Sequence, residues 1–367
     1  MSRPILVIGG GVAGSVCALR LRQHGLPVHL VEKESFPRAK VCGCCIGGTG
    51  VSVLQRVEMG GWISDNAQAT QTWMGSLGGR SVRIPLTAGV AISREKLDTE
   101  LLARVRESGA VVHSPVSANV DSIDKNRVGV ILKGASGSDE LQDYSAVVLA
   151  SGLNASGSKR LLPWTELPHG PFGASFFANV DGLPTGVIGM ACDREGYVGV
   201  VRLEDGRVDV AAALSSGASH RVNGSPKQRI LKILERSHLP VGSIEVISEV
   251  MVTPPLRRSR LSGTGRLVAI GDASGYVEPF TGEGMTWGMM SGYAIADLIA
   301  DSRGDFQSLG QRWCRRQKRL LGSRRRTCRL LTTILQNSVA RFGAAQVLSR
   351  FPSFAKPLTA HLSRPLD

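Results

Sequence analysis

Hydrophobic residues near the start of the chain form two short runs separated by a helical stripe. Pro4 to Ile8 is an uninterrupted apolar run, typical of a strand buried on both faces of a sheet. Val16 and Leu19 recur at helical spacing up to His24-Gly25, and a second apolar run, Pro27 to Val31, follows. The pattern predicts a strand, a helix and a second strand.

Two further apolar runs of this kind occur much later in the chain. Val147 to Leu149 leads into Ala150-Ser151-Gly152, and Arg266 to Ile270 leads into a glycine-rich stretch. The segment from Met285 to Ala300 has the length and apolar content of a buried helix. We expect these elements to join the first two strands in one α/β domain.

The middle of the chain has a different pattern. Between residues 173 and 215 the apolar runs are short, and turn residues separate them. Tyr197 to Leu203 and Gly206 to Leu214 lie on either side of the turn Glu204-Asp205-Gly206, which is a hairpin signature. This region predicts an antiparallel sheet, and residues 225–238 predict a helix.

The length of 367 residues suggests two domains and a smaller third part. The predicted α/β domain is discontinuous and takes residues 1–75, 90–160 and 255–302. The predicted antiparallel-sheet domain takes residues 76–89 and 161–254, and residues 303–367 form a helical segment. No run reaches the roughly 18 consecutive apolar residues of a spanning helix, and the N-terminus lacks the features of a signal peptide.

Positive charge is concentrated at the C-terminus. The whole chain has 44 basic and 30 acidic residues, a difference of +14. Residues 301–367 hold 14 basic and 3 acidic residues, or +11, so the first 300 residues carry only +3. The aromatic platforms and motifs of nucleic-acid-binding proteins are missing, so nucleic acid is not an expected partner.

The densest basic sequence runs from Gln311 to Leu330, and Trp313, Leu320 and Leu321 are interleaved with it. This spacing predicts a cationic amphipathic helix pair. Three interpretations are open: solvated helices packed on the α/β domain, peripheral contact with anionic lipid headgroups, or a surface for a partner such as an acidic carrier protein.

Residues 9–14, between the first strand and the first helix, fit the pattern G-x-G-x-x-G. Gly9 permits a tight turn, Gly11 lets the backbone approach a pyrophosphate, and Gly14 lets the helix pack closely on the strand. The helix N-terminus offers N–H groups to phosphates, and Glu32 can accept hydrogen bonds from a ribose. The unit predicts dinucleotide binding and leaves FAD and NAD open. The predicted contact residues are Gly9, Gly11, Ala13, Gly14, Glu32 and Lys33.

A second glycine-rich signature follows the strand Arg266 to Ile270. It reads Gly271-Asp272-Ala273, then Pro279-Phe280-Thr281-Gly282-Glu283-Gly284, then the helical stretch. This order resembles the second FAD fingerprint of the p-hydroxybenzoate hydroxylase-like flavoproteins. The resemblance implies that Asp272 binds the ribityl chain and that the turn presents a helix N-terminus to the flavin pyrimidine. That placement is favourable because reduced flavin carries negative charge near N1 and O2. The residues so assigned to the cofactor are Gly271, Asp272, Pro279, Gly282, Glu283 and Gly284.

Two smaller elements are similar to the same family. Ser93 to Asp98 matches its R-x-x-L-D element, whose arginine, Arg94 here, lies near the cofactor. Gly152 ends the A-x-G strand that returns to the nucleotide-binding sheet. The resemblance implies a three-layer, Rossmann-like FAD-binding domain with an antiparallel-sheet substrate domain. Because the chain has one G-x-G-x-x-G unit, a separate NAD(P)H-binding domain is not expected, and NAD(P)H would be a transient electron donor.

Within that superfamily the chain most resembles geranylgeranyl reductase-like flavoproteins. Phe36 to Gly43 matches their F-P-R-x-K-x-C-G segment, in which the cysteine, Cys42 here, lies near the flavin and the lipid pocket. Their Tyr-x-Trp-x-Phe-Pro motif is only partly present: Tyr197 stands in the comparable stretch, without the tryptophan and the Phe-Pro pair. The Trp-x-Trp-x-Ile-Pro motif of flavin halogenases is absent from the sequence.

The cluster Cys42-Gly43-Cys44-Cys45 is compatible with several roles. The odd total of seven cysteines does not suggest a secreted disulfide framework and favours a reducing cytoplasm. No second cluster would complete a zinc site, so a metal is not expected. A functional thiol near the flavin, on Cys42 or then Cys45, a redox pair, covalent flavin attachment and simple core packing all remain open.

We therefore expect a cytoplasmic FAD-dependent oxidoreductase, with peripheral membrane contact as an alternative location. The favoured reaction is hydride transfer from reduced flavin N5 to a carbon–carbon double bond of a hydrophobic lipid, isoprenoid or polyketide. A proton would follow from Cys42, Tyr197 or water, and His169 is a further candidate donor. The first alternative is an NAD(P)H-dependent flavin monooxygenase that hydroxylates a secondary metabolite. The second is a non-catalytic flavin-binding protein associated with a membrane.

Overall fold

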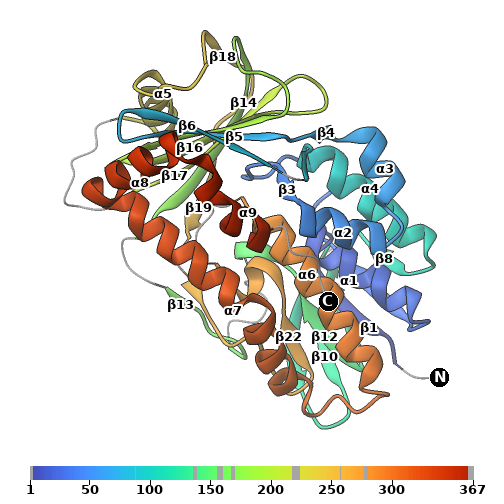
Figure 1. The fold of residues 1–367 in the computed structure, drawn as a ribbon. Helices are drawn as coiled ribbons and strands as arrows, with labels where there is room; N and C mark the ends of the chain where they lie inside the picture. The colour runs from blue at the N-terminus through green and yellow to red at the C-terminus, as the bar shows by residue number, and fades with distance from the viewer. Residues whose placement is uncertain are drawn as a thin grey trace.

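The computed structural model describes residues 3–86, 88–134, 139–154, 160–166, 170–216, 224–256, 258–276, 280 and 282–362. Two residues singled out in the sequence, His169 and Pro279, lie outside this description. Two halves, each built around a sheet, lie side by side, and the C-terminal helices run along both (Figure 1).

One half contains a six-stranded sheet. Its order is β21 (Gly263–Thr264), β22 (Leu267–Ala269), β12 (Ala146–Leu149), β1 (Ile5–Ile8), β2 (Val28–Val31) and β8 (Val111–His113). Neighbouring strands are parallel from β22 to β8, and β21 is antiparallel to β22. The apolar runs predicted as buried strands therefore lie together in the sheet, and the α/β fold class is confirmed.

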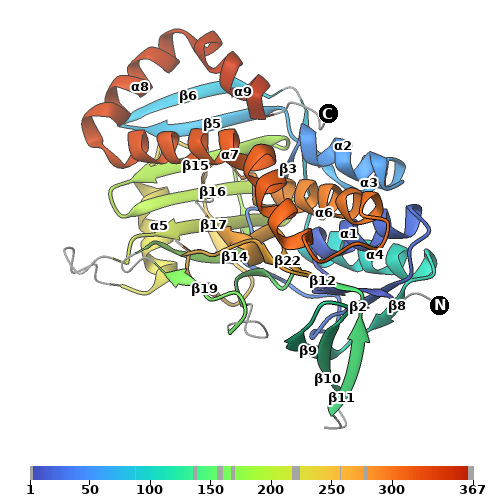
Figure 2. The same cartoon turned by 90° about the horizontal axis from the view of Figure 1, so that it is seen from below.

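The two faces of this sheet are covered differently, which gives three layers (Figure 2). Ile5 and Val7 of β1 pack with helices α1 (Val12–Gln23), α4 (Arg94–Glu107) and α6 (Gly284–Asp301). Leu6 and Ile8 point the other way and pack against Val130 in the antiparallel sheet. That sheet consists of β9 (Val116–Ile123), β10 (Val128–Gly134) and β11 (Asp139–Tyr144).

The second half is an eight-stranded sheet. Its order is β18 (Ile244–Val246), β14 (Phe172–Val180), β17 (Val208–Leu214), β16 (Gly196–Arg202), β15 (Val187–Asp193), β5 (Thr72–Leu77) and β6 (Arg80–Pro85), and β19 (Met251–Pro255) also pairs with β14. Neighbours are antiparallel except β5 and β15, which are parallel. Helix α5 (Pro226–Glu235) starts from a capping box at Ser225 and packs on this sheet.

The remaining elements are short. They are α2 (Gly48–Arg56), α3 (Gly60–Asn66), β3 (Cys45–Gly47), β4 (Gln68–Ala69), β7 (Gly89–Ala91), β13 (Thr165–Glu166), β20 (Arg258–Ser259) and β23 (Gly275–Tyr276). The predicted domain borders stay a prediction. Strand β5 begins at Thr72, ahead of the border placed at residue 75, and belongs to the eight-stranded sheet.

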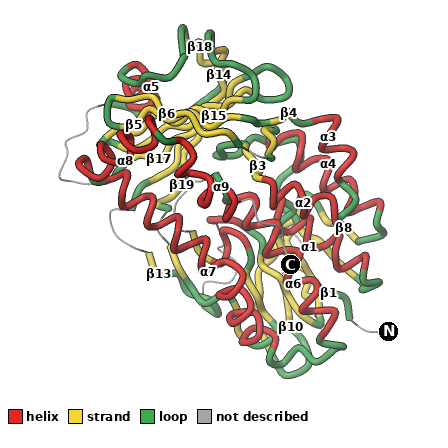
Figure 3. Tube along the Cα trace, viewed as in Figure 1, coloured by secondary structure: helices red, strands yellow, loops and turns green. Residues whose placement is uncertain are grey.

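The C-terminal segment contains helices α7 (Leu309–Gln336), α8 (Ser338–Arg350) and α9 (Lys356–Leu362). The prediction of a helix pair over the basic stretch is wrong, because α7 continues without a break through Gly322 to Gln336. The first turns of α7 lie beside β21 and β22. Helix α8 lies beside β5 and β6 (Figure 3), so the segment contacts both halves. Within the residues described, no helix is both long and apolar enough to cross a membrane.

Candidate functional site

A cavity of about 550 Å³ lies where the two halves and the C-terminal helices meet. Its size is in the range of small-molecule and cofactor sites. Residues predicted from the sequence that line it are Gly11, Ala13, Cys42, Cys45, Arg94, Gly152, Tyr197, Gly271, Asp272, Gly282, Glu283 and Gly284. The fold thus gathers residues from seven separate stretches of chain around one space.

The glycine-rich loop after β1 has the geometry that its sequence predicts. Gly9 has a φ of +113°, and a Cβ atom there would lie 2.5 Å from the carbonyl oxygen of Ala150. A Cβ atom on Gly14 would lie 1.9 Å from the carbonyl oxygen of Gly9. Gly11 is the N-cap of α1 without a side-chain cap, so the helix N-terminus is left for a ligand at the cavity wall.

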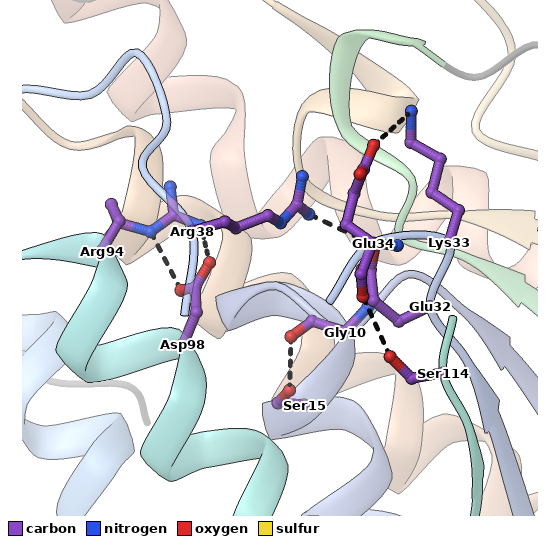
Figure 4. A network of polar contacts seen from close by, with 9 residues as sticks. All are labelled: Gly10, Ser15, Glu32, Lys33, Glu34, Arg38, Arg94, Asp98 and Ser114. Atoms are coloured by element: carbon purple, nitrogen blue, oxygen red, sulfur yellow. Dashed lines mark hydrogen bonds and ion pairs between the residues drawn. The ribbon is translucent and has the colours of Figure 1, made fainter. Parts of the chain in front are cut away.

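Glu32, at the end of β2, is turned toward this loop. Its carboxylate accepts hydrogen bonds from the backbone N–H of Gly10 at 2.7 Å and of Glu34 at 2.9 Å (Figure 4). Arg38 lies 3.4 Å from the same carboxylate. Glu32 therefore holds the loop in place. It does not line the cavity, and neither does Lys33, whose ammonium pairs with Glu34 at 3.2 Å.

Two cations stand at the N-terminus of α1. A Cβ atom on Gly11 would lie 3.5 Å from an Arg94 guanidinium nitrogen and 3.6 Å from Lys40 Nζ. Burial, and after it the positive charge of Arg94, lowers the pKa of Lys40 to about 8. An anion here would offset the free-energy cost of burying the positive charge of Lys40, because it would interact with two buried cations and a helix N-terminus.

Arg94 is fixed by a neighbour on its own helix. It donates two hydrogen bonds to the carboxylate of the fully buried Asp98, at 2.9 and 2.6 Å, and Figure 4 shows the two side chains facing each other. Helix α4 starts at Arg94 because the Ser93 side chain accepts a hydrogen bond from the N–H of Lys96. The bidentate contact orients the guanidinium toward the cavity.

The second glycine-rich signature lies on the same cavity. Asp272 belongs to the short 3-10 turn Gly271–Ser274, and burial raises the pKa of its carboxyl, which the positive charges of Lys40 and Arg94 oppose. Glu283 is the N-cap of α6 and provides no side-chain cap, so this second helix N-terminus also opens at the cavity wall. Two uncapped helix N-termini, two buried cations and a buried carboxylate fit a cofactor with a pyrophosphate at one end and an anionic ring at the other.

Comparisons with known proteins agree with this arrangement. The family described as pyridine nucleotide-disulphide oxidoreductase matches residues 3–183. A menaquinone reductase of Mycobacterium tuberculosis is 24% identical over 82% of this chain and 77% of its own length. Digeranylgeranylglycerophospholipid reductase 2 of Methanothermobacter thermautotrophicus is 25% identical over 87% of this chain and 84% of its own. The chain is an FAD-dependent oxidoreductase.

Solved structures share the whole fold. The flavin-dependent brominase Bmp2 matches with a TM-score of 0.84 and 17% identity, over 99% of this chain and 94% of the brominase. The p-nitrophenol 4-monooxygenase PnpA of Pseudomonas putida matches with a TM-score of 0.79 and 15% identity, over 97% of both chains. These similarities place the oxidoreductase in the p-hydroxybenzoate hydroxylase-like fold expected from its two FAD fingerprints.

The candidate catalytic residues of this oxidoreductase also line the cavity. Cys42 accepts a hydrogen bond from the backbone N–H of Cys44 at 3.4 Å. The hydrogen bond from the Cys44 thiol, and then the positive charge of Arg94, lower the pKa of Cys42 to about 6, against its burial. Burial raises the pKa of the Cys45 thiol instead. The Tyr197 ring stands edge-on to Phe280, with ring centroids 5.3 Å apart.

The C-terminal helices complete the site, which the sequence did not predict. Arg324 of α7 pairs with Glu283 at 3.4 Å and contacts Thr49 at 3.3 Å. Trp287 donates a hydrogen bond to Glu283 at 2.7 Å. Burial raises the pKa of Glu283 to about 7 despite these partners. Glu283, predicted only as a cofactor contact, thus also joins α6 to α7.

Lys40, Asp98 and Arg324 are the site residues that sequence reasoning missed. Lys40 was visible as the lysine of the F-P-R-x-K-x-C-G segment, and Asp98 as the aspartate of R-x-x-L-D. Arg324 gave no signal, because it is one of many arginines in a basic helix and only packing distinguishes it. The described residues contain no group of three or more His, Cys, Asp or Glu side chains arranged to hold a metal ion.

Proposed function

We propose that this oxidoreductase reduces a carbon–carbon double bond of a hydrophobic, lipid-like substrate. The observation that carries the proposal is the apolar wall of the cavity beyond the cofactor residues. Side chains from the eight-stranded sheet and from the C-terminal helices form that wall, among them Ile188, Met190, Val200, Leu331, Leu335 and Leu348. Such a wall favours a long apolar ligand, because burying it gains free energy in proportion to area and excludes water.

Different residues of the site would bind the cofactor and orient the substrate. Lys40, Arg94 and the N-terminus of α1 would bind the pyrophosphate, and Asp272 the ribityl chain. Bound FAD supplies the hydride that reaches the substrate. The N-terminus of α6 would stabilise negative charge at the pyrimidine end of the ring. The apolar wall would orient the substrate and keep the site dry.

The proton donor is a narrower question. With a pKa of about 6, the thiol of Cys42 is mostly ionised at neutral pH and has no proton to give. Tyr197 lines the same cavity, and its hydroxyl is the better candidate. Tyr197→Phe is expected to lower turnover by ~100-fold or more, as loss of a general acid does, and to leave FAD binding unchanged.

Product analysis tests the reaction itself. The FAD-loaded protein with NADPH would be given digeranylgeranylglycerophospholipid or menaquinone, the lipids named for two relatives, with and without oxygen. A double-bond reductase yields product heavier by two hydrogens per reduced double bond in both atmospheres, and with menaquinone this gain persists after the ring is reoxidised to the quinone. A product that gains one oxygen atom, and only in air, would establish the monooxygenase alternative. Tyr197→Phe, which is expected to turn over more slowly, serves as the control that the product comes from this site.

We also propose that the substrate is taken from an anionic membrane surface. Six large apolar side chains on the C-terminal helices are exposed, and we call them the C-terminal apolar face: Leu330, Val339, Phe342, Val347, Phe351 and Phe354. Val339 and Phe342, three residues apart, share one side of α8. Ala344 and Leu348, four residues apart, lie on another side of the helix and line the cavity. A lipid could therefore pass from this face to the site over a short distance.

The charge of this region suits an anionic bilayer. From Phe306 to Leu362 the sequence has twelve basic residues and no acidic one. Basic residues near an anionic surface contribute about 1 kcal/mol each, and exposed aromatic side chains insert at the interface. A carrier protein would present an apolar arm to one pocket, whereas the C-terminal apolar face extends over α7, α8 and the turn that follows α8.

Vesicle sedimentation tests this surface. The protein should sediment with phosphatidylglycerol vesicles and far less with phosphatidylcholine vesicles. Phe354→Glu, at a site 66% exposed, should lower sedimentation several-fold, whereas Leu141→Glu, at a 63% exposed site on β11 at the other end of the molecule, should not (Figure 2). Equal loss in both variants, or binding to neither kind of vesicle, would contradict the proposal and favour an acidic carrier protein as the partner.

A further inference from the structure

Two of the clustered cysteines face each other at the edge of the cavity. The thiol of Cys44 hydrogen-bonds to the sulfur of Cys42, and the backbone N–H of Cys44 donates to the same sulfur at 3.4 Å. Both residues line the cavity. Cys45 begins β3, where it pairs with Ala91, and the carbonyl of Cys44 accepts a hydrogen bond from Ile92. The turn that brings the two sulfurs together is therefore anchored on its C-terminal side.

The backbone at Cys44 is unusual. Its φ is +49°, in the left-handed region that glycine favours and other residues adopt rarely and at a cost. The conformation directs both the N–H and the thiol of Cys44 back at Cys42. A strained conformation held by its surroundings is a frequent mark of a functional turn, and here its direct effect is the contact between the two sulfurs.

Charged groups from two elements flank the pair. Arg94 of α4 lies on the Cys42 side, and its positive charge and hydrogen bond stabilise the thiolate. Asp209 of β17 lies on the Cys44 side, with its carboxylate within hydrogen-bonding reach of the Cys44 thiol. Asp209 is 2% exposed, and its Oδ2 atom has no hydrogen-bond partner among the residues that the structure describes. Arg207, in the turn just before β17, is the other charge that acts on Asp209.

We propose that Cys42 and Cys44 are a redox-active dithiol that forms a reversible disulfide by exchange with a low-molecular-weight disulfide. In the first step the Cys42 thiolate attacks one sulfur of that disulfide, and the other sulfur leaves as a thiolate. In the second step Cys44 gives its proton to Asp209 and attacks the Cys42 sulfur, and a second small thiolate leaves. The protein pair loses two electrons, the small disulfide gains them and becomes two thiols, and the proton held by Asp209 passes to solvent or to a leaving thiolate.

The charges of Cys42, Cys44 and Asp209 favour attack by Cys42 first and by Cys44 second. Cys42 is ionised near neutral pH and is the nucleophile, whereas the hydrogen bond to Cys42 and burial raise the pKa of Cys44 and keep it protonated. Burial and then the Cys42 charge raise the pKa of Asp209. Once Cys42 has reacted, its negative charge is gone. The pKa values of Cys44 and Asp209 then fall, so Asp209 ionises more readily and can accept the proton of Cys44, and Cys44 becomes a readier second nucleophile.

The disulfide itself is the readout, and no turnover assay is needed. The protein, with and without FAD, would be equilibrated in glutathione buffers of increasing disulfide fraction, alkylated and analysed by mass spectrometry. We expect a Cys42–Cys44 disulfide that forms in oxidising buffer and is reversed by excess thiol. Cys45→Ser removes a neighbouring thiol that takes no part in the proposed exchange. This variant is the matched control and should form the same disulfide.

Two variants separate the steps. Cys44→Gly suits the left-handed backbone and so keeps the fold, and it should trap glutathione on Cys42 as a stable mixed disulfide. Asp209→Asn should slow closure of the disulfide by ~10-fold or more, because the base for Cys44 is lost. The proposal is overturned if the pair stays reduced in every buffer, if Cys45 replaces Cys44 in the disulfide, or if glutathione stays on Cys42 while Cys44 is present. These outcomes do not depend on which substrate the flavoenzyme reduces.

Discussion

At the scale of single residues, the site is defined by where buried charges meet. Lys40 and Arg94 stand within 4 Å of where a Cβ atom of Gly11 would be, at the start of α1. The glycine-rich loops and Asp272 could be predicted from the sequence, because their motifs are local and continuous. The pairing of Glu283 with Arg324, or of Cys44 with Asp209, could not be predicted, since each pair joins segments that only the fold brings together.

The ionisation of Cys42 can be measured directly. Its alkylation by iodoacetamide, in a Cys45→Ser background, should follow a thiolate with a midpoint near pH 6, rising with pH and levelling above it. Cys44→Gly removes the hydrogen bond that contributes most to this shift, so the midpoint should move to higher pH. If the alkylation midpoint of Cys42 lies near the pKa of an ordinary thiol while Cys44 is present, then Cys44 does not stabilise the Cys42 thiolate.

Glu283 gives a pH dependence of stability with a definite sign. Its pKa is about 7 in the folded protein and 4.5 in an ordinary setting, so the folded state favours the protonated carboxyl. Stability is therefore lost as pH rises from 4.5 through 7, by about 3 kcal/mol at most. Both proteins would be measured without FAD. The melting temperature of Glu283→Gln, relative to that of the unaltered protein, should rise as the pH rises from 5 to 8. Glu107→Gln, an exposed site, should show no such trend.

At the scale of elements, close helix packing positions the glycine-rich loop. A Cβ atom on Gly292 of α6 would lie 2.3 Å from the carbonyl oxygen of Ala13 in α1, so the two helices can cross only because no side chain stands there. The strands and the long helix near 285–300 could be predicted from their apolar runs. Strand β5 could not be assigned to the eight-stranded sheet, because its parallel partner β15 lies more than a hundred residues later.

Replacing Gly292 by alanine should separate these helices. We expect a loss of roughly 1–3 kcal/mol, seen as a drop of several degrees in melting temperature and weaker FAD binding. Gly322 of α7 is the matched control: nothing lies within 4 Å of its Cβ position, so Gly322→Ala should stabilise the protein by up to about 1 kcal/mol. Equal effects at the two glycines would mean that the α1–α6 crossing does not need a glycine.

At the scale of the whole molecule, the basic C-terminal segment is a wall of the site. Trp313 is fully buried and donates a hydrogen bond to the carbonyl of Ala269 at 2.9 Å, and Gln317 donates to Ser274 at 2.8 Å. The sequence showed the positive charge and predicted a helical segment, but it predicted a helix pair where α7 is one helix, and it left the position open. Basic residues and interleaved leucines fit a free surface helix equally well. Whether such a helix is free on the surface or packed on the site depends on its contacts with the two sheets, which only the fold shows.

Trp313→Ala tests this role of α7. We expect a loss of about 3–5 kcal/mol in stability from the emptied space, with lower FAD affinity because α7 no longer holds the turn at Gly271–Ser274. Arg316→Ala, at an exposed position one turn further along α7, should change neither quantity. Normal FAD affinity in Trp313→Ala would show that the C-terminal helices are not part of the cofactor site.

Anaerobic reoxidation of the flavin is the most direct test of the proposed reaction. The FAD-loaded oxidoreductase would be reduced with dithionite, freed of excess reductant and mixed without oxygen with digeranylgeranylglycerophospholipid. The visible absorption of oxidised flavin should return at a rate that depends on lipid concentration, with one saturated bond formed per flavin. A flavin that stays reduced with this lipid and with menaquinone, and reoxidises only when air is admitted while the lipid gains oxygen, would contradict double-bond reduction.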